Sequence, residues 1–275
     1  MSSTADPLAP LAALPGVQDA VDSVRKSVDR IYGHRVMRRR SSEVSAEAAL
    51  RGARASAALE GADWALEELR RRTDFGAEGE PRVVGAALRA TAESGQLLDV
   101  WRQSPLRVLA RLHLVAAGGS GSAPDDTVGR PRLAGEKVSG PEQQTEPPDA
   151  GEVAARLDAL ARIVVDGSEA PALVLGAVVH GELATLRPFV SYNGLVARAA
   201  ERVVLVGSGL DPKSICPAEV GQAELGRDAY RLALDGYASG TPEGMAAWLG
   251  HCGKALELGA RETTAVCEAL QRGAA

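Results

Sequence analysis

The segment LRPFVSYNGLVAR spans residues 186–198 and joins two predicted helices. Apolar periodicity places the first helix at 171–186 and the second at 195–206. Asn193-Gly194, just before the second helix, is typical of a turn. Phosphate groups bind at such helix starts because the first four backbone N–H groups are unpaired and the helix dipole adds positive potential. The segment therefore predicts a helix–loop–helix unit with the geometry of an anion site.

The composition of the 275-residue chain favours an all-α fold. Only 3% of the residues are aromatic, whereas Ala, Leu, Val and Arg are abundant, which favours closely packed helices over strands. The formal net charge of −5 gives no electrostatic case for binding nucleic acid. No apolar run is long enough to span a bilayer, and the apolar stretch at 8–14 is too short for a signal peptide. We therefore expect a cytoplasmic protein that binds neither nucleic acid nor membrane.

Helical periodicity also organises the rest of the chain. An amphipathic helix is expected at 17–31, within an N-terminal arm formed by residues 1–40, and residues 41–275 are expected to form one domain. Within 43–72, two helices are expected to meet at Gly61. Further helices are expected at 83–101, 105–117, 152–165, 217–236 and 242–270.

Residues 186–198 match half of the motif that defines the Fic (Fido-domain) family, His-x-Phe-x-Asp/Glu-Gly-Asn-Gly-Arg-x-x-Arg. The matching residues are Phe189, Asn193, Gly194 and Arg198. The chain resembles this family from about residue 41 to its end, because Tyr230, Trp248 and Cys252 also look like parts of the helices that close a Fic core. The resemblance implies a Fic-type helical bundle with a central helix–loop–helix motif, and an ancestor that transferred AMP from ATP to a protein hydroxyl.

Four positions depart from the family motif. Arg187 stands at the position of the His, Ser191 at that of the Asp/Glu, Tyr192 at that of the first Gly and Leu195 at that of the first Arg. A guanidinium stays charged and accepts no proton, so Arg187 cannot act as the general base. Loss of that base and of the magnesium-holding carboxylate should abolish AMP transfer. ATP stays a candidate ligand, whereas magnesium is not favoured and no metal site is predicted.

Arg187 could instead hold a phosphate as a fixed hydrogen-bond donor. With the matching motif positions, this makes Arg187, Asn193, Gly194 and Arg198 the candidate nucleotide-binding residues. Tyr192 adds a ring where the family has Gly, which weakens or blocks binding if this position needs a positive φ or a close approach of the backbone to the ligand.

A second resemblance lies upstream, where residues 56–61 read SAALEG. This matches the Ser/Thr-x-x-x-Glu-Gly/Asn motif of Fic proteins whose inhibitory helix precedes the domain. Ser56 and Glu60 are four residues apart and share one helix face. By the resemblance, Glu60 should pair with Arg198 and Ser56 with Asn193. The alternative is that Glu60 and Arg198 are unrelated surface charges.

The remaining candidate residues are expected to be structural. His180 lies seven residues before Arg187, about 10 Å away along a helix that rises about 1.5 Å per residue. His113, between Leu112 and Leu114, is expected to be a buried core histidine. The three cysteines are widely spaced and show neither a disulfide framework nor a zinc pattern.

The longest irregular stretch, residues 118–151, is rich in Gly, Ser, Pro and Asp. In the Fic family this place holds the flap, a β-hairpin that pairs with the target protein as an added strand. Residues 129–132 resemble its start, and the remainder is expected to be a disordered insertion. The alternative is disorder throughout 118–151.

Three hypotheses about function follow. The first is a Fic-fold pseudoenzyme that no longer transfers AMP and acts through nucleotide binding or through a protein bound at the flap. The second is an active adenylyltransferase, or a related phosphoryl transferase, of altered mechanism, inhibited by Glu60. The third is a helical interaction module without a nucleotide site, whose amphipathic helix at 17–31 makes a homo-oligomer.

Overall fold

The computed structural model describes residues 6–76, 78–118, 124–140 and 146–273. Within these ranges the chain forms thirteen α-helices and one short 3-10 helix, η1, with no strand, which confirms the all-α prediction. The elements are α1 (Ala9–Ala12), α2 (Val17–Tyr32), α3 (Met37–Leu59), α4 (Leu66–Arg71), α5 (Glu80–Ser94), α6 (Leu98–Trp101), α7 (Pro105–Ala117), η1 (Asp125–Thr127), α8 (Ala150–Asp166), α9 (Ala172–Leu186), α10 (Asn193–Gly207), α11 (Ala218–Leu225), α12 (Arg227–Ser239) and α13 (Pro242–Gln271).

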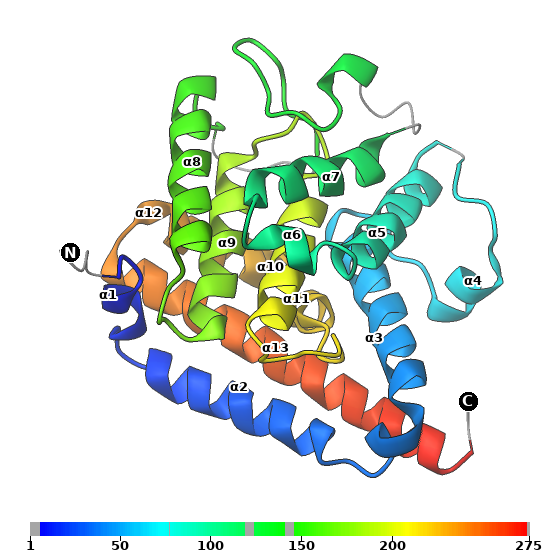
Figure 1. The fold of residues 1–275 in the computed structure, drawn as a ribbon. Helices are drawn as coiled ribbons and strands as arrows, with labels where there is room; N and C mark the ends of the chain where they lie inside the picture. The colour runs from blue at the N-terminus through cyan, green and yellow to red at the C-terminus, as the bar shows by residue number, and fades with distance from the viewer. Residues whose placement is uncertain (1–5, 77, 119–123, 141–145, 274–275) are drawn as a thin grey trace.

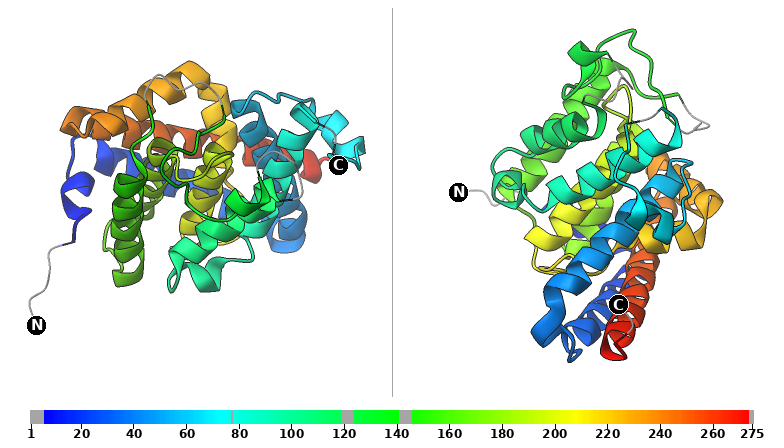
Figure 2. Two further views of the ribbon diagram at one scale, coloured as in Figure 1. Left: turned by 90° about the horizontal axis from the view of Figure 1, so that it is seen from above. Right: turned by 90° about the vertical axis from the view of Figure 1, so that its right-hand side faces the viewer.

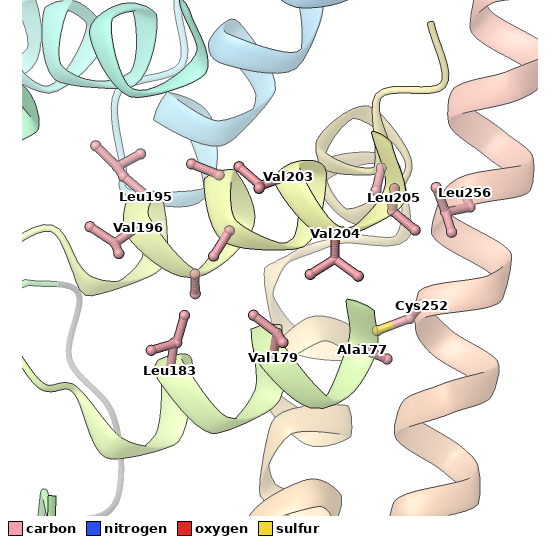
Figure 3. Close-up of a cluster of buried hydrophobic side chains, with 14 of the residues drawn as sticks. Ala177, Val179, Leu183, Leu195, Val196, Val203, Val204, Leu205, Cys252 and Leu256 are labelled. Atoms are coloured by element: carbon pink, nitrogen blue, oxygen red, sulfur yellow. The ribbon is translucent and has the colours of Figure 1, made fainter. Parts of the chain in front are cut away.

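The antiparallel pair α9 and α10 forms the centre of the bundle (Figures 1 and 2). Helix α9 is apolar on every side and most of its residues are buried, as expected of a helix surrounded by others. In Figure 3, Val179 and Leu183 of α9 point toward α10, and Val204 of α10 points back toward α9. Helices α5, α7, α8, α12 and α13 pack around this pair. The loop between the two central helices is therefore held on a rigid scaffold.

The amphipathic helix expected at 17–31 is confirmed as α2, and it lies along the C-terminal helix α13 (Figure 1). Its buried stripe of Val17, Val24, Val28 and Ile31 recurs at helical spacing. The apolar face of α2 is thus covered within this chain. Among the described residues, no helix combines the length and the apolar character that crossing a membrane requires.

Several boundaries differ from those expected. The predicted helix at 217–236 is two helices, α11 and α12, because Gly226 has φ 94° between them. The helix predicted at 83–101 ends at Ser94, and α6 is a separate turn. The break predicted at Gly61 is present, with φ 102°, but α3 starts earlier than expected and α4 is short. A positive φ favours glycine and cannot continue a helix.

Helices α11 and α13 pack with their backbones close together. A Cβ on Gly221 of α11 would lie 2.0 Å from the carbonyl oxygen of Ala255, and one on Gly259 of α13 would lie 2.3 Å from that of Pro217. Since these contacts are with backbone atoms, no side-chain movement could relieve them. The two helices can approach only because these positions lack side chains.

We predict that Gly221→Ala lowers the free energy of unfolding by about 1–3 kcal/mol, because the added methyl group overpacks this contact. Gly250→Ala is the matched control. Gly250 is also within a helix, but no atom lies within 4 Å of the place of its Cβ, so this change should stabilise the protein by about 0.5–1 kcal/mol. Urea denaturation measures both values, and equal effects would contradict the packing described.

Candidate functional site

The loop between α9 and α10 starts and ends with residues in the left-handed region. Arg187 caps the end of α9 with φ 47° and ψ 63°, and Tyr192 precedes α10 with φ 55° and ψ 25°. Each costs about 1 kcal/mol for a residue that carries a Cβ. Tyr192 occupies the position of the family glycine, so the backbone has kept a shape that suits glycine. The loop must be held by other contacts.

Asn193 supplies two of these contacts. Its Oδ1 accepts a hydrogen bond from the Phe189 backbone N–H at 2.8 Å, and its Nδ2 donates to the Phe189 carbonyl at 2.8 Å. Both ends of the amide are thus bound to the loop backbone. Asn193 therefore shapes the loop. A ligand can bind this side chain only through the second lone pair of Oδ1 or the second N–H of Nδ2.

His113 of α7 packs behind the loop. Its ring stacks on Phe189 with the ring centres 4.3 Å apart, and both side chains are buried. Its Nδ1 accepts a hydrogen bond from the Gly129 N–H at 3.0 Å, so the proton of the neutral ring lies on Nε2, 3.5 Å from the Ser191 Oγ. Burial lowers the pKa of His113 to about 4. His113 is the buried core histidine that the sequence predicts, and with its Nε2 protonated it cannot take a proton from Ser191.

Residues 124–140 lie along the outer side of the loop. The Arg132 N–H donates to the Pro188 carbonyl at 2.7 Å, and the Ser139 N–H donates to the Val190 carbonyl at 2.7 Å. The Arg132 Nε also donates to the Arg187 carbonyl at 2.9 Å. Residues 124–140 contain no strand, in contrast to the expected hairpin. The disordered insertion expected within 118–151 falls partly at 119–123 and 141–145, which lie outside the described residues.

Glu60, at the end of α3, forms an ion pair with Arg198 of α10. The Arg198 Nη2 lies 2.7 Å from the Glu60 Oε1, and the two side chains are 2% and 9% exposed. The pair expected from the sequence is therefore present, and the alternative of two unrelated surface charges is wrong. Burial opposes the charge of Arg198, but Glu60 outweighs it and raises the pKa of Arg198.

Ser56 makes a different contact from the one expected. Its Oγ accepts a hydrogen bond from the Arg198 Nε at 2.8 Å, and its carbonyl accepts one from the Arg198 Nη2 at 3.1 Å. The expected pair of Ser56 with Asn193 is wrong, because the Asn193 amide is bound to Phe189. Ser56 and Glu60 both bind Arg198, which ties α3 to α10.

A cavity of about 310 Å³ lies between the end of α3, residues 138–140, the loop and α12. Among the described residues, its lining holds four arginines and two carboxylates, so this part of the cavity is basic. These residues are Arg187, Arg198, Arg227, Arg231, Glu60 and Asp235. A basic cavity beside a helix start suits a phosphate-bearing ligand.

The structure brings most of the predicted site residues to this cavity. Arg187, Asn193, Gly194, Arg198 and Glu60 all line it, whereas Ser56 and Ser191 do not. Glu60 covers the start of α10, since its Oε1 would lie 2.1 Å from a Cβ on Gly194. The cavity is therefore partly filled by a carboxylate of the chain itself.

Arg227 and Arg231 of α12 were missed by sequence reasoning. They are four residues apart and flank Tyr230 on one helix face, which the string RDAYR shows. Such a basic pair is common on solvated helices, so the sequence alone does not distinguish a cavity wall from an exposed surface.

No model of a known protein family matches the sequence, and no curated protein matches it. Solved structures nevertheless share its fold. A Fic family protein from Desulfovibrio desulfuricans G20 superposes with a TM-score of 0.73 at 20% identity, over 92% of this chain and 75% of that one. A fragment of Fic-1 from C. elegans superposes with a TM-score of 0.63 at 17% identity, over 92% of this chain and 73% of that one.

A Fic domain containing signaling protein from Bacteroides thetaiotaomicron VPI-5482 gives a TM-score of 0.61 at 12% identity, over 90% of this chain and 98% of that one. This chain thus has the Fic fold, as the resemblance at residues 186–198 predicts.

We predict that acid destabilises the protein through His113. Its pKa falls from an ordinary value of 6.5 to about 4 in the fold, so the unfolded chain binds more protons between these values. Stability should drop as the pH falls from about 6.5 to about 4, by about 1.4 kcal/mol per pH unit at most for one histidine. His251, whose burial also lowers its pKa to about 4, adds a second contribution.

Urea denaturation of wild type and His113→Gln at several pH values tests this. The variant should be less stable at neutral pH, because it loses the stacking on Phe189, and its stability should fall less steeply below pH 6.5. If the free energy of unfolding depended on pH in the same way in both proteins, His113 would not be the cause of the loss of stability in acid.

Proposed function

We propose that this chain is a Fic-family pseudoenzyme, which has lost AMP transfer and acts through nucleotide binding or protein contact. The observation that supports this most is the side chain of Arg187 in the wall of the cavity, at the position of the family base. Among the described residues that line the cavity there is no histidine. Since a guanidinium accepts no proton, the target hydroxyl has no base at this position.

The position that holds magnesium in the family does not fit the ion here. Ser191 is buried, and its Oγ faces the His113 Nε2 rather than the cavity. Magnesium prefers carboxylate and phosphate oxygens as ligands. The Ser191 hydroxyl carries no charge, and because it is directed into the core, an ion in the cavity could not reach it. We therefore derive no step that uses magnesium.

Nucleotide binding is proposed because the remaining anion-binding features are intact. The start of α10 faces the cavity, and three arginines besides Arg198 line it. Glu60 stands against this start and holds Arg198, so a phosphate there must displace it. Breaking a buried ion pair costs about 3–5 kcal/mol when one charge is left unpaired. The phosphate can offset this cost by replacing the carboxylate on Arg198.

We predict that Glu60→Gly binds ATP more tightly than wild type, by about tenfold or more in Kd, equivalent to about 1.4 kcal/mol. The change removes both the carboxylate that competes for Arg198 and its volume over Gly194. Calorimetric titration of ATP into each protein measures the effect, with and without magnesium. A magnesium dependence would contradict the role given to Ser191.

One further variant tests whether the charge or the volume of the Glu60 side chain hinders ATP binding, and a second serves as a control. Glu60→Gln keeps the size of the side chain and removes its charge, so it should show part of the increase in ATP affinity expected for Glu60→Gly. Asp63→Asn removes a carboxylate three residues away, which is 68% exposed and pairs with Arg54 instead, so binding should be unchanged. No ATP binding by any folded variant would leave protein contact as the function.

A second candidate is an active enzyme of altered mechanism. Asp235 is an exposed carboxylate in the lining of the same cavity, and it could take the proton that Arg187 cannot. The Glu60–Arg198 pair would then restrain a working enzyme.

Incubation of Glu60→Gly with ATP labelled at the α or the γ phosphate distinguishes the two candidates. As a pseudoenzyme, the protein should incorporate no label into itself or into added protein. Incorporation that is lost in the double variant Glu60→Gly, Asp235→Asn would instead identify an active transferase. The α label would indicate AMP transfer, and the γ label alone would indicate phosphoryl transfer.

A further inference from the structure

Three side chains of different chemistry meet in the core below the cavity. His180 comes from α9, Glu201 from α10 and Cys252 from α13, and their ligand atoms all lie within 4.8 Å of one another. The side chains of His180 and Glu201 are 0% and 2% exposed, and Cys252 is fully buried. Figure 3 shows Cys252 reaching from α13 toward the central helices. Nothing in the sequence spacing marks these residues as a group.

The hydrogen bonds within this cluster leave acceptor atoms without a donor. The His180 Nδ1 lies 2.8 Å from the Glu201 Oε2, but the Glu201 Oε1 and the Gln222 Oε1 are buried and have no hydrogen-bond partner among the residues that the structure describes. A buried acceptor without a donor is unfavourable, and more so when it carries charge. The unpaired Glu201 oxygen, in a carboxylate that contacts the histidine, indicates a missing electropositive partner.

The charges around the cluster lead to the same conclusion. Arg198 pairs with Glu60 at 2.7 Å, and Arg202 pairs with Glu219 at 2.8 Å, so both nearby guanidinium groups on α10 already have partners. Among the described residues, no arginine or lysine pairs with the Glu201 carboxylate, which contacts the His180 Nδ1 and the Gln222 Nε2 instead. An uncompensated charge in the core is strongly unfavourable.

We propose that His180, Glu201 and Cys252 bind a zinc ion, with the Gln222 amide oxygen as the fourth ligand. Nitrogen, sulfur and carboxylate oxygen together suit zinc, whereas magnesium and calcium take oxygen ligands. The Cys252 thiol loses its proton to solvent when the metal binds. The thiolate and the carboxylate then balance the two charges of the ion.

Two of the distances match those of a tetrahedral site, and the Cys252 sulfur lies within 4.8 Å of the His180 and Glu201 ligand atoms. Zinc bonds of about 2.0–2.3 Å place ligand atoms about 3.3–3.8 Å apart. The Gln222 Nε2 lies 3.4 Å from both the His180 Nδ1 and the Glu201 Oε2, and an amide flip, which exchanges N and O, puts the oxygen there. The His180–Glu201 distance must widen by about half an ångström.

Tyr230 is placed to hydrogen-bond with one of the metal ligands in such a site. Its hydroxyl lies 2.7 Å from the His180 Nε2, and a metal-binding histidine ordinarily donates its other N–H to a neighbouring group. This leaves the Nδ1 lone pair free for the metal. Tyr230 also lines the cavity. The ion would join α9, α10, α11 and α13, and it would fix Tyr230 in the cavity wall.

The metal content of the full-length chain tests this, after purification without a polyhistidine tag or chelator. Mass spectrometry should find one zinc per chain. Exchange for cobalt should give the intense visible bands of a tetrahedral ion and a thiolate-to-cobalt band in the near ultraviolet. Cys252→Ser should lose the thiolate band, and Cys267→Ser, a change of another buried cysteine on α13, should keep it.

The isosteric variant Glu201→Gln provides a second test if Cys252→Ser does not fold. It should bind metal at least tenfold more weakly than wild type, because a carboxylate ligand is lost. A folded wild-type protein that contains no zinc and takes up no cobalt would overturn the proposal. The contact between His180 and Glu201 would then be a hydrogen bond within the core. A cobalt spectrum without the thiolate band would also overturn it.

Discussion

The buried charge of Arg198 is the constraint on which the site depends. Its guanidinium is 2% exposed at the centre of the bundle, where an unpaired charge would be strongly unfavourable. Glu60 neutralises it, and Ser56 accepts two of its hydrogen bonds. All three partner atoms come from the last turn of α3 and its cap. This part of the chain is therefore bound to the start of α10, and it closes one side of the cavity.

The loop beside Arg198 holds a backbone shape that needs support from other contacts. Arg187 and Tyr192 hold left-handed conformations that are unfavourable for residues with a Cβ. The Asn193 amide bonds, the stacking of Phe189 on His113 and the contacts of Arg132 and Ser139 hold the loop in this form. The shape of the loop is thus maintained by hydrogen bonds and ring stacking with its neighbours in the fold.

Much of the fold could be predicted from local patterns. The helices near 17–31, 105–117 and 171–186 were placed to within one or two residues, because periodic apolar positions and Pro or Gly at their ends act locally. The break at Gly226 was missed, since a glycine within a periodic pattern is compatible with a continuous helix. In the site, the Glu60–Arg198 pair followed from the resemblance, but the partner of Ser56 did not. An arginine at the centre of the bundle has several donors, and packing decides which acceptors they reach.

The sequence by itself determined that the chain is helical, that the segment 186–198 joins two helices through a loop, and that Arg187 cannot serve as a base. These properties depend on composition, on periodicity and on the chemistry of single side chains. Only the tertiary structure decided that Ser191 faces His113, that Arg227 and Arg231 line the cavity, and that His180, Glu201 and Cys252 meet. Those residues come from separate helices, and their distances are set by how the helices pack. The spacing of these residues along the sequence does not predict how the helices pack.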